Sequence, residues 1–306
     1  MRIVIALGGN ALLRRGEPLT AEAQARNVGV AGAALATLGR DHGLVVTHGN
    51  GPQVGLLALQ DAAVPESGGF PLDVLGAEST GMIGYMVAQE FRNRLPGRQI
   101  ATLLTQIEVD PRDPAFQRPT KPIGPVYEEA EARALAERRG WAIAPDGKGY
   151  RRVVPSPKPL RILEVDTLKL LAGAGVVVIC AGGGGIPVVF DPWGNVHGVE
   201  AVIEKDLSAA LVAKQVAADA LLLLTDAEAV YEDWGTDRAR PIRHATPEEI
   251  RSYSFPEGSM GPKVEAAADF VERTGGIAGI GRLRDAEAIL RGTAGTQITN
   301  RARSAG

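Results

Sequence analysis

The sequence predicts an α/β protein, a three-layer sandwich around a mainly parallel, open sheet from which a small subdomain protrudes. Two observations predict the sandwich. Strand-like and helix-like segments alternate along most of the chain, which is typical of parallel strands joined by crossover helices. Several strand-like runs are apolar on both faces, as expected when helices cover both sides of a sheet. The subdomain is predicted because a proline-rich stretch interrupts this alternation.

The first third of the chain shows the alternation clearly. The elements expected there are strand 3–7, helix 21–38, strand 44–47, helix 71–95 and strand 100–105. Thr20 is expected to cap the first helix and Gly39 to end it. Pro52 suits the first position of a helix after the second strand. Gly84 is expected to interrupt the long helix.

The character of the chain changes after residue 110. Five prolines fall between 110 and 125 without any apolar period, and a charged helix is expected at 128–139. We therefore expect a protruding subdomain over about 108–160. A long irregular insertion in a compact domain is usually a lid or a binding loop, and a variable surface loop is the alternative.

Regular alternation resumes in the C-terminal half. The elements expected there are helix 166–173, strand 176–181, hairpin 187–199, helix 207–217, strand 221–224, helix 262–273, strand 277–280 and helix 285–290. A chain of 306 residues is long enough for one large α/β domain or for two lobes that share a sheet.

Three of the apolar strands run directly into glycine-rich turns. The turns are Gly8-Gly9-Asn10, His48-Gly49-Asn50-Gly51 and Gly182-Gly183-Gly184-Gly185. Glycine has no Cβ, so the backbone N–H groups of such turns can approach an anion closely. Several turns of this kind at the carboxyl edge of one sheet predict a site for phosphate chemistry.

Composition excludes several classes of function. A net charge of −3 and a pI near 5.9 argue against binding to nucleic acid, which requires a basic face. The longest apolar runs are strand-sized, well below the ~20 residues that span a bilayer. The chain starts as a strand without a leader pattern, and its one cysteine, Cys180, lies in an apolar run. We expect a cytoplasmic protein that binds neither membrane nor nucleic acid, with Cys180 buried and inert.

The familiar phosphate-binding motifs are absent from the sequence. The run from Gly182 has proline at its sixth position and is followed by a β-like run, so it is no dinucleotide fingerprint. The one Gly-Lys pair, at 147–148, is followed by glycine rather than the serine or threonine of a P-loop. The protein-kinase glycine loop, the serine hydrolase elbow and metal-ligand spacings of cysteine and histidine are also missing.

Phosphoryl transfer depends on positioning and on positive charge around the transferred group. Lysines in constrained contexts are therefore the candidates: Lys121 between prolines, Lys205 at the mouth of a helix, and Lys263 directly after Pro262. A lysine is usually a solvated surface group. Lys263 departs most from that expectation, because a helix N-terminus and an ammonium group would act on the same anion.

Two aspartates and a tyrosine accompany these lysines. Asp206 and Asp226 are candidates to orient the lysines or to hold Mg²⁺. Helix capping explains Asp206 equally well. Tyr231 is a candidate for stacking on a base, although plain packing is as common for an aromatic residue there.

Several stretches together resemble the amino acid kinase family, and within it the carbamate kinases. They follow one another in order over nearly the whole chain. The stretches are 6–12 (ALGGNAL), 47–55 (THGNGPQVG), 119–124 (PTKPIG), 149–157 (GYRRVVPSP), 182–188 (GGGGIPV), Lys205-Asp206, 224–226 (LTD) and 258–264 (GSMGPKV). The stretches 47–55 and 258–264 are the ones specific to this family.

The resemblance implies one domain, 1–306, with an acceptor lobe at about 1–200 and a nucleotide lobe at about 201–306. It also implies that Lys121, on the protruding subdomain, supplies the charge that other members of the family place after the first strand. Lys205 and Lys263 would match the lysines that bind the ATP phosphates, with Asp206 orienting them. Glu204 departs from the pattern, which has aspartate there, and it is not predicted to be a site residue.

The function that the resemblance implies is reversible phosphoryl transfer between ATP and carbamate, giving ADP and carbamoyl phosphate with Mg²⁺. Mg²⁺ would be held mainly by the nucleotide phosphates, the protein would be a homodimer, and the reaction would belong to arginine metabolism. The residues expected to bind the acceptor are Gly8, Gly9, Asn10, Gly49, Asn50 and Gly51. The residues expected to bind the nucleotide are Gly183, Gly184, Thr225, Asp226, Tyr231, Met260 and Gly261. Another small-acid kinase of this fold, or a non-catalytic nucleotide sensor, remains an alternative.

Overall fold

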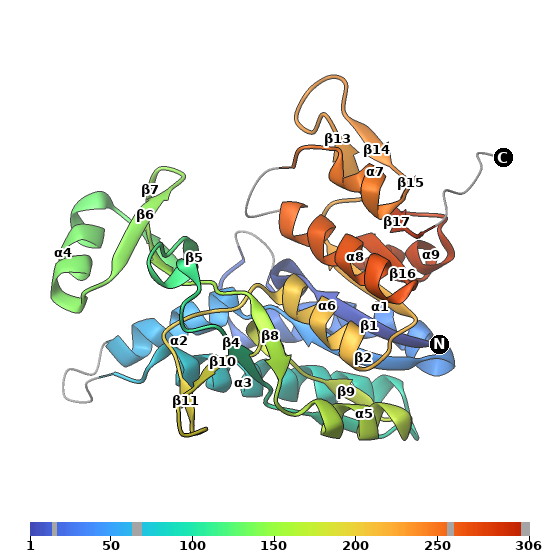
Figure 1. Ribbon diagram of the computed structural model, residues 1–306, viewed down its shortest axis with the longest axis horizontal. Coiled ribbons are helices and arrows are strands. Elements are labelled where there is room, and N and C mark those ends of the chain that lie inside the picture. Colours follow the sequence, from blue (N-terminus) through green and yellow to red (C-terminus); the bar gives the residue numbers. More distant parts are fainter. Residues whose placement is uncertain (14–16, 63–68, 256–259, 301–306) are drawn as a thin grey trace.

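The computed structural model describes residues 1–13, 17–62, 69–255 and 260–300, and its body is built on an eight-stranded sheet (Figure 1). The strand order is β15-β17-β16-β12-β1-β2-β9-β3. The bounds are β1 Arg2–Leu7, β2 Gly43–His48, β3 Ile100–Thr102, β9 Val177–Ile179, β12 Ala220–Thr225, β15 His244–Ala245, β16 Ile277–Arg282 and β17 Thr296–Ile298. The pairs that these strands form are parallel, apart from β16 with β17. The predicted fold class is confirmed.

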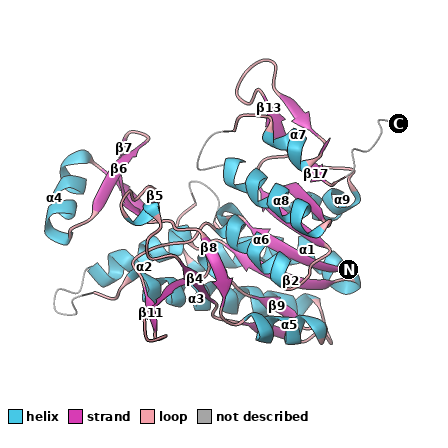
Figure 2. Ribbon diagram, viewed as in Figure 1, coloured by secondary structure: helices cyan, strands magenta, loops and turns pink. Residues whose placement is uncertain are grey.

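Helices cover both faces of this sheet, because alternate side chains of each buried strand point in opposite directions (Figure 2). Val4 and Ala6 of β1 face one hydrophobic cluster, whereas Ile3 and Ile5 face the other. The helices on the first face are α5 Val165–Gly173, α6 Lys205–Gln215 and α8 Met260–Thr274. The helices on the second face are α1 Ala21–Asp41, α3 Leu72–Arg94 and α9 Ala286–Arg291.

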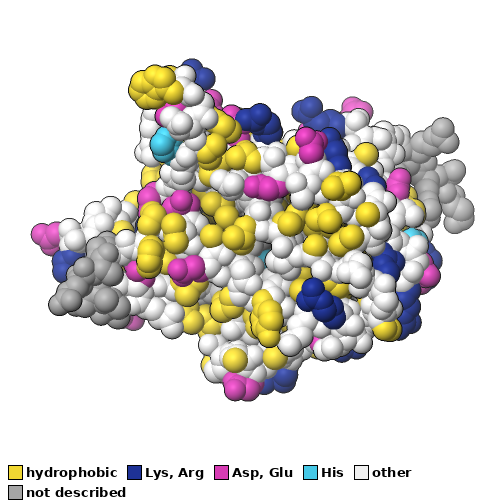
Figure 3. Space-filling view, turned by 90° about the horizontal axis from the view of Figure 1, so that it is seen from below, with side chains coloured by type: hydrophobic (Ala, Val, Ile, Leu, Met, Phe, Trp, Pro, Cys, Tyr) yellow, Lys and Arg dark blue, Asp and Glu magenta, His cyan; other side chains and the backbone are white. Residues whose placement is uncertain are grey.

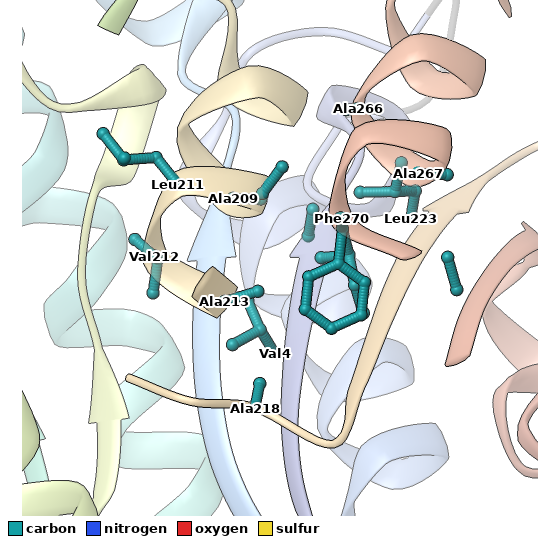
Figure 4. Packing of buried hydrophobic residues seen from close by; sticks show 14 of the residues in the cluster. Val4, Ala209, Leu211, Val212, Ala213, Ala218, Leu223, Ala266, Ala267 and Phe270 are labelled. Carbon is teal, nitrogen blue, oxygen red and sulfur yellow. The ribbon is translucent and has the colours of Figure 1, made fainter. Parts of the chain in front are cut away.

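Small side chains allow α6 and α8 to lie close to the sheet and to each other (Figure 4). Ala213 of α6 and Ala267 of α8 are fully buried against the strands, and Phe270 fills the space between them beside Val4 and Leu223. This packing matters for the site, because α6 and α8 carry two of the candidate lysines at their N-terminal ends.

A second region projects from the body, at the left of Figure 1. It contains a three-stranded antiparallel sheet, β5-β7-β6, and helix α4. The bounds are β5 Lys121–Tyr127, α4 Glu129–Arg139, β6 Ala142–Asp146 and β7 Gly149–Val154. Strand β5 includes Pro122 and Pro125, which it tolerates because it is an edge strand with an irregular register after Ile123. These strands were not predicted.

A four-stranded sheet, β11-β10-β4-β8, lies where the projecting region meets the body. Its strands are β4 Gln106–Val109, β8 Pro159–Ile162, β10 Ile186–Phe190 and β11 Val196–Gly198, and the last two form the predicted hairpin. The remaining elements are α2 Gly51–Ala62, the β13 Val230–Glu232 and β14 Arg240–Ile242 ribbon, α7 Pro247–Arg251 and four short 3₁₀ turns. The ribbon and α7 were also not predicted.

Two glycines have roles other than those predicted. Helix α1 continues past Gly39 to Asp41, and a Cβ on Gly39 would lie 2.7 Å from Cδ1 of Leu95. Helix α3 is unbroken at Gly84, where a Cβ would lie 2.4 Å from Cγ2 of Thr102. Both glycines therefore serve close packing rather than helix termination. The prediction for Thr20 is confirmed, because its hydroxyl accepts a hydrogen bond from the backbone of Ala23.

Cys180 is buried, as predicted, and burial raises the pKa of its thiol to about 12, so it stays protonated at neutral pH. In the part of the chain that the structure describes, no helix combines the length and apolar character needed to cross a membrane.

Candidate active site

The three glycine turns lie together at one edge of the main sheet. Strands β1, β2 and β9 are neighbours and run parallel, so the turns that follow them emerge side by side. A Cβ on Gly49 would lie 3.4 Å from the backbone nitrogen of Gly9 and 3.7 Å from Cδ of Lys205. The first two turns are thus in contact, and the side chain of Lys205 runs beside them. The side chain of Asn10 is outside the described part of the structure.

The third turn packs against the second through two side chains. A Cβ on Gly183 would lie 2.2 Å from Nδ2 of Asn50, and a Cβ on Gly182 would lie 2.5 Å from the ring of His48. Asn50 also donates a hydrogen bond of 2.8 Å to Oγ of Ser79 in α3. Gly183 and Gly184 both have positive φ, at 66° and 95°. Glycine is therefore needed here for backbone conformation as well as for space.

Asp206 joins two of the candidate lysines. Its carboxylate is fully buried in the first turn of α6, where it accepts hydrogen bonds from Lys205 at 2.5 Å and from Lys263 at 2.8 Å. The capping interpretation of Asp206 is wrong, because the cap position of α6 belongs to Glu204 and the carboxylate of Asp206 bonds to side chains. The helix expected at 262–273 also starts earlier than predicted: α8 begins at Met260, so Pro262 is its third residue. Gly258 and Ser259 lie outside the described residues.

The charges of this cluster are fixed by mutual contact. Burial alone would raise the pKa of Asp206, but the ammonium groups of Lys205 and Lys263 lower it to about 2. Burial lowers the pKa of Lys205, and Asp206 opposes that shift. Two ammonium groups share one carboxylate, which leaves an excess positive charge beside the glycine turns. Such an excess suits an anionic ligand.

Lys121 reaches the same place from the projecting region. It is the first residue of β5, and its ammonium group forms an ion pair with the carboxylate of Glu204. Both residues line a cleft of about 1010 Å³ whose lining also includes residues along α6, from Leu207 to Lys214, and along α8, from Gly261 to Arg273. Between them, Glu204 and Asp206 therefore pair with all three predicted lysines. Glu204 was not predicted as a site residue, and the available signal was its departure from the aspartate of the family pattern.

The other predicted nucleotide-binding residues lie at the ends of nearby elements. Thr225 ends β12, beside β1, and the carbonyl of Asp226 accepts a hydrogen bond from Arg282. Tyr231 belongs to β13, and its ring centroid lies 5.1 Å from that of Trp234. Met260 and Gly261 begin α8 and are separated from Lys263 by Pro262. Their roles in binding remain predictions.

His48 was predicted only as part of a glycine turn, yet its side chain is fully buried, with its ring beside Gly182 of the third turn. Burial lowers the pKa of its imidazole to about 4, so the ring is neutral at pH 7. Nδ1 lies 3.0 Å from the carbonyl oxygen of Gly49, and a neutral ring donates a hydrogen bond to it through Nδ1–H. The ring thus supports the second and third turns.

The carboxylates at the site do not form a metal site. Among the described residues, no three histidine, cysteine, aspartate or glutamate side chains gather closely enough to hold an ion. The carboxylates of Glu204 and Asp206 already bind lysines. The lysine ammonium groups and the glycine-turn N–H groups therefore make the site suited to phosphate oxygens.

A sheet with glycine turns and lysines at its carboxyl edge defines a phosphate-binding α/β protein. The chain belongs to the amino acid kinase family, whose model matches residues 1–280.

Relatives within the family are carbamate kinases. The carbamate kinase of Haemophilus influenzae (strain ATCC 51907 / DSM 11121 / KW20 / Rd) is 56% identical over 302 residues, covering 98% of this chain and 97% of the relative. That of Escherichia coli (strain K12) is 54% identical over 297 residues, covering 97% and 99%. The structure of the carbamate kinase from Giardia lamblia bound to AMP-PNP superposes with a TM-score of 0.90 at 40% identity, covering 97% of this chain and 98% of that chain.

Proposed function

We infer that this chain is an ATP-dependent carbamate kinase, which transfers a phosphoryl group reversibly between ATP and carbamate. The observation that carries this conclusion is the gathering of Lys121, Lys205 and Lys263 around residues 204–206, beside the three glycine turns. The relatives named carbamate kinase, 54–56% identical over nearly the whole chain, indicate the acceptor.

The reaction exchanges two P–O bonds. A carbamate oxygen attacks the γ-phosphorus of ATP, the bond to the bridging β–γ oxygen breaks, and its electron pair leaves with ADP. Carbamate is already an anion, so no side chain has to remove a proton. The scheme therefore needs no general base, and His48, which is buried and neutral, is not assigned that role.

We assign the two substrates to the two sides of the site. Backbone N–H groups of Gly9, Asn10, Asn50 and Gly51 bind carbamate and the γ-phosphoryl oxygens. Gly8 and Gly49, whose N–H groups donate to the carbonyls of Leu224 and Leu7, line the same site and leave it open because they have no Cβ. Lys205 and Lys263, oriented by Asp206, bind the nucleotide phosphates, and Lys121 offsets the charge on the transferred group. Gly183, Gly184, Thr225, Asp226, Tyr231, Met260 and Gly261 complete the nucleotide site. Residues of about 1–200 then form the acceptor lobe, and those of about 201–306 the nucleotide lobe.

The nucleotide-associated metal is Mg²⁺ in this proposal, held mainly by the ATP phosphates. When bound, it would neutralise part of the negative charge of the nucleotide phosphates. The lysines do the remaining work on the protein side: they orient the phosphate chain and face the equatorial oxygens of the transferred group.

We further propose a cytoplasmic homodimer. Strand β3 ends the main sheet, and the face seen from that side carries hydrophobic side chains across its middle (Figure 3). Exposed side chains on elements of this part of the fold include Tyr85 of α3 and Leu104 just after β3, which are 65% and 51% exposed. Large exposed apolar groups often mark a contact surface. Light scattering should give twice the chain mass of 32.1 kDa, and a value of one chain mass would reject the dimer.

The assay that tests the function starts from ADP and carbamoyl phosphate and follows ATP formation, with Mg²⁺ and with a chelator. We expect ATP to form only when the metal is present. Nucleotide binding in calorimetry without turnover would instead favour a sensor. Turnover with a different small acid, but none with carbamoyl phosphate, would favour another kinase of this fold.

A further inference from the structure

Glu204 connects the projecting region to the helix that carries the lysine cluster. Glu204 is the N-cap residue of α6. Its carboxylate pairs with the ammonium group of Lys121, which lies 83 residues earlier in the chain. The side chains of Glu204 and Lys121 are 19% and 33% exposed, so the pair is partly desolvated. An ion pair in this setting is stronger than one on the open surface.

Glu204 accepts a hydrogen bond from the ammonium group of Lys121, just as Asp206 accepts hydrogen bonds from the other two lysines. An ammonium group has three N–H donors. Lys205 and Lys263 each donate one hydrogen bond to Asp206, and Lys121 donates one to Glu204. Among the hydrogen bonds between described residues, each of the three ammonium groups uses one donor in this way, which leaves two for a ligand. Glu204 and Asp206 are two residues apart and flank Lys205, whose charge both of them stabilise.

The backbone of β5 alone does not fix the ammonium group of Lys121. Strand β5 is held to α2 where Gly55 meets Gly124: a Cβ on Gly55 would lie 2.5 Å from the Cα of Gly124, which has a φ of 72°. This contact places the Cα of Lys121, three residues away. The side chain beyond it has four rotatable carbons, so its charged end needs a partner of its own.

We propose that Glu204 is a positioning residue that holds the ammonium group of Lys121 at the cleft, aimed at the transferred phosphoryl group. The proposal rests on the proposed function, because it assigns a role within that reaction. Glu204 does not contact the reacting atoms; it restricts Lys121 to the rotamers that face α6 and brings β5 towards the nucleotide lobe. Its effect should therefore appear in turnover rather than in nucleotide binding.

The test compares Glu204→Gln, which removes the charge and keeps the shape, with Glu204→Asp, which keeps the charge. ATP formation from ADP and carbamoyl phosphate should lose about fivefold in kcat in Glu204→Gln, with the KM for ADP within about twofold, because fivefold is the upper end of what one partly exposed ion pair contributes. Glu204→Asp should recover most of the loss. In a Lys121→Ala background, Glu204→Gln should have no further effect, because the residue that it positions is absent.

The matched control is Glu200→Gln. Glu200 pairs with Arg152 of β7 and so also joins the projecting region to the body, but it does not pair with a candidate catalytic lysine. We expect its kcat to stay within about twofold of wild type. An equal loss in both Gln variants, or an additive loss in the Lys121→Ala background, would overturn the proposal. Wild-type protein without turnover would reject the proposed function, whereas active wild type with unchanged Glu204→Gln would reject the positioning role alone.

Discussion

The site holds its lysines in two different ways. Lys205 and Lys263 lie 12% and 15% exposed around a fully buried carboxylate, on helices that pack into the main hydrophobic cluster. Lys121 is 33% exposed and lies on the edge strand of a small sheet outside that cluster. Because its side chains are buried and paired, we expect the first arrangement to be the rigid half of the site before any substrate binds. The second depends on contacts between two parts of the fold, so we expect it to be the adjustable half of the site.

The comparison predicts that the rigid half carries the larger share of catalysis. Lys263→Ala should reduce kcat by on the order of 10²–10³, which is typical for the loss of one preorganised charge that faces a transferred group. The measurement is the kinetics of ATP formation from ADP and carbamoyl phosphate. Lys169→Ala, on the exposed side of α5, is a control that should leave kcat unchanged. A Lys263→Ala variant with more than about a tenth of wild-type kcat would remove Lys263 from the reaction.

The rigid half should also contribute to stability. Asp206→Asn leaves two partly buried ammonium groups without a counter-ion, and breaking a buried charge arrangement of this kind costs about 3 kcal/mol. Urea unfolding should show that decrease. Glu204→Gln, which removes the counterpart in the adjustable half, should change the free energy of unfolding by less than about 1 kcal/mol. Equal losses in the two variants would erase the distinction between the halves.

The adjustable half should respond to its docking contact. Gly55→Ala places a Cβ 2.5 Å from the Cα of Gly124, so β5 must move away from α2 and take Lys121 with it. We expect kcat to fall about tenfold, while the overpacking destabilises the fold by about 1–3 kcal/mol. Gly173→Ala in α5 is the control, because a Cβ there also meets nothing within 4 Å and the residue has no part in the site. Its stability should be unchanged. A Gly55→Ala variant with wild-type kcat would mean that the docking contact does not place Lys121.

The same contrast explains what the sequence could predict. The central strands could be predicted, because strands buried on both faces have continuous apolar sequences; these are β1, β2, β9 and β12. Strands β5 to β7 were missed, because they lie on a small, partly exposed sheet where prolines and charges replace that pattern. Gly39 and Gly84 were misread, because a glycine's role depends on what approaches it, and Leu95 and Thr102 come from other segments. The pairing of Lys121 with Glu204 depends on how the projecting sheet meets the body, which no local pattern encodes.

The last prediction concerns pH and His48, whose ring contacts the second and third glycine turns. Its folded pKa, about 4, lies below the ordinary value of 6.5, so the unfolded chain binds a proton that the folded chain does not. Stability is therefore fully present above pH 6.5 and falls as the pH drops towards 4, by about 1 kcal/mol per pH unit within that window. Urea unfolding of wild type and His48→Gln between pH 5 and 7 measures this slope. The variant should lack this contribution to the slope, because glutamine does not titrate. An identical slope in both proteins would mean that His48 is not held neutral in the folded chain.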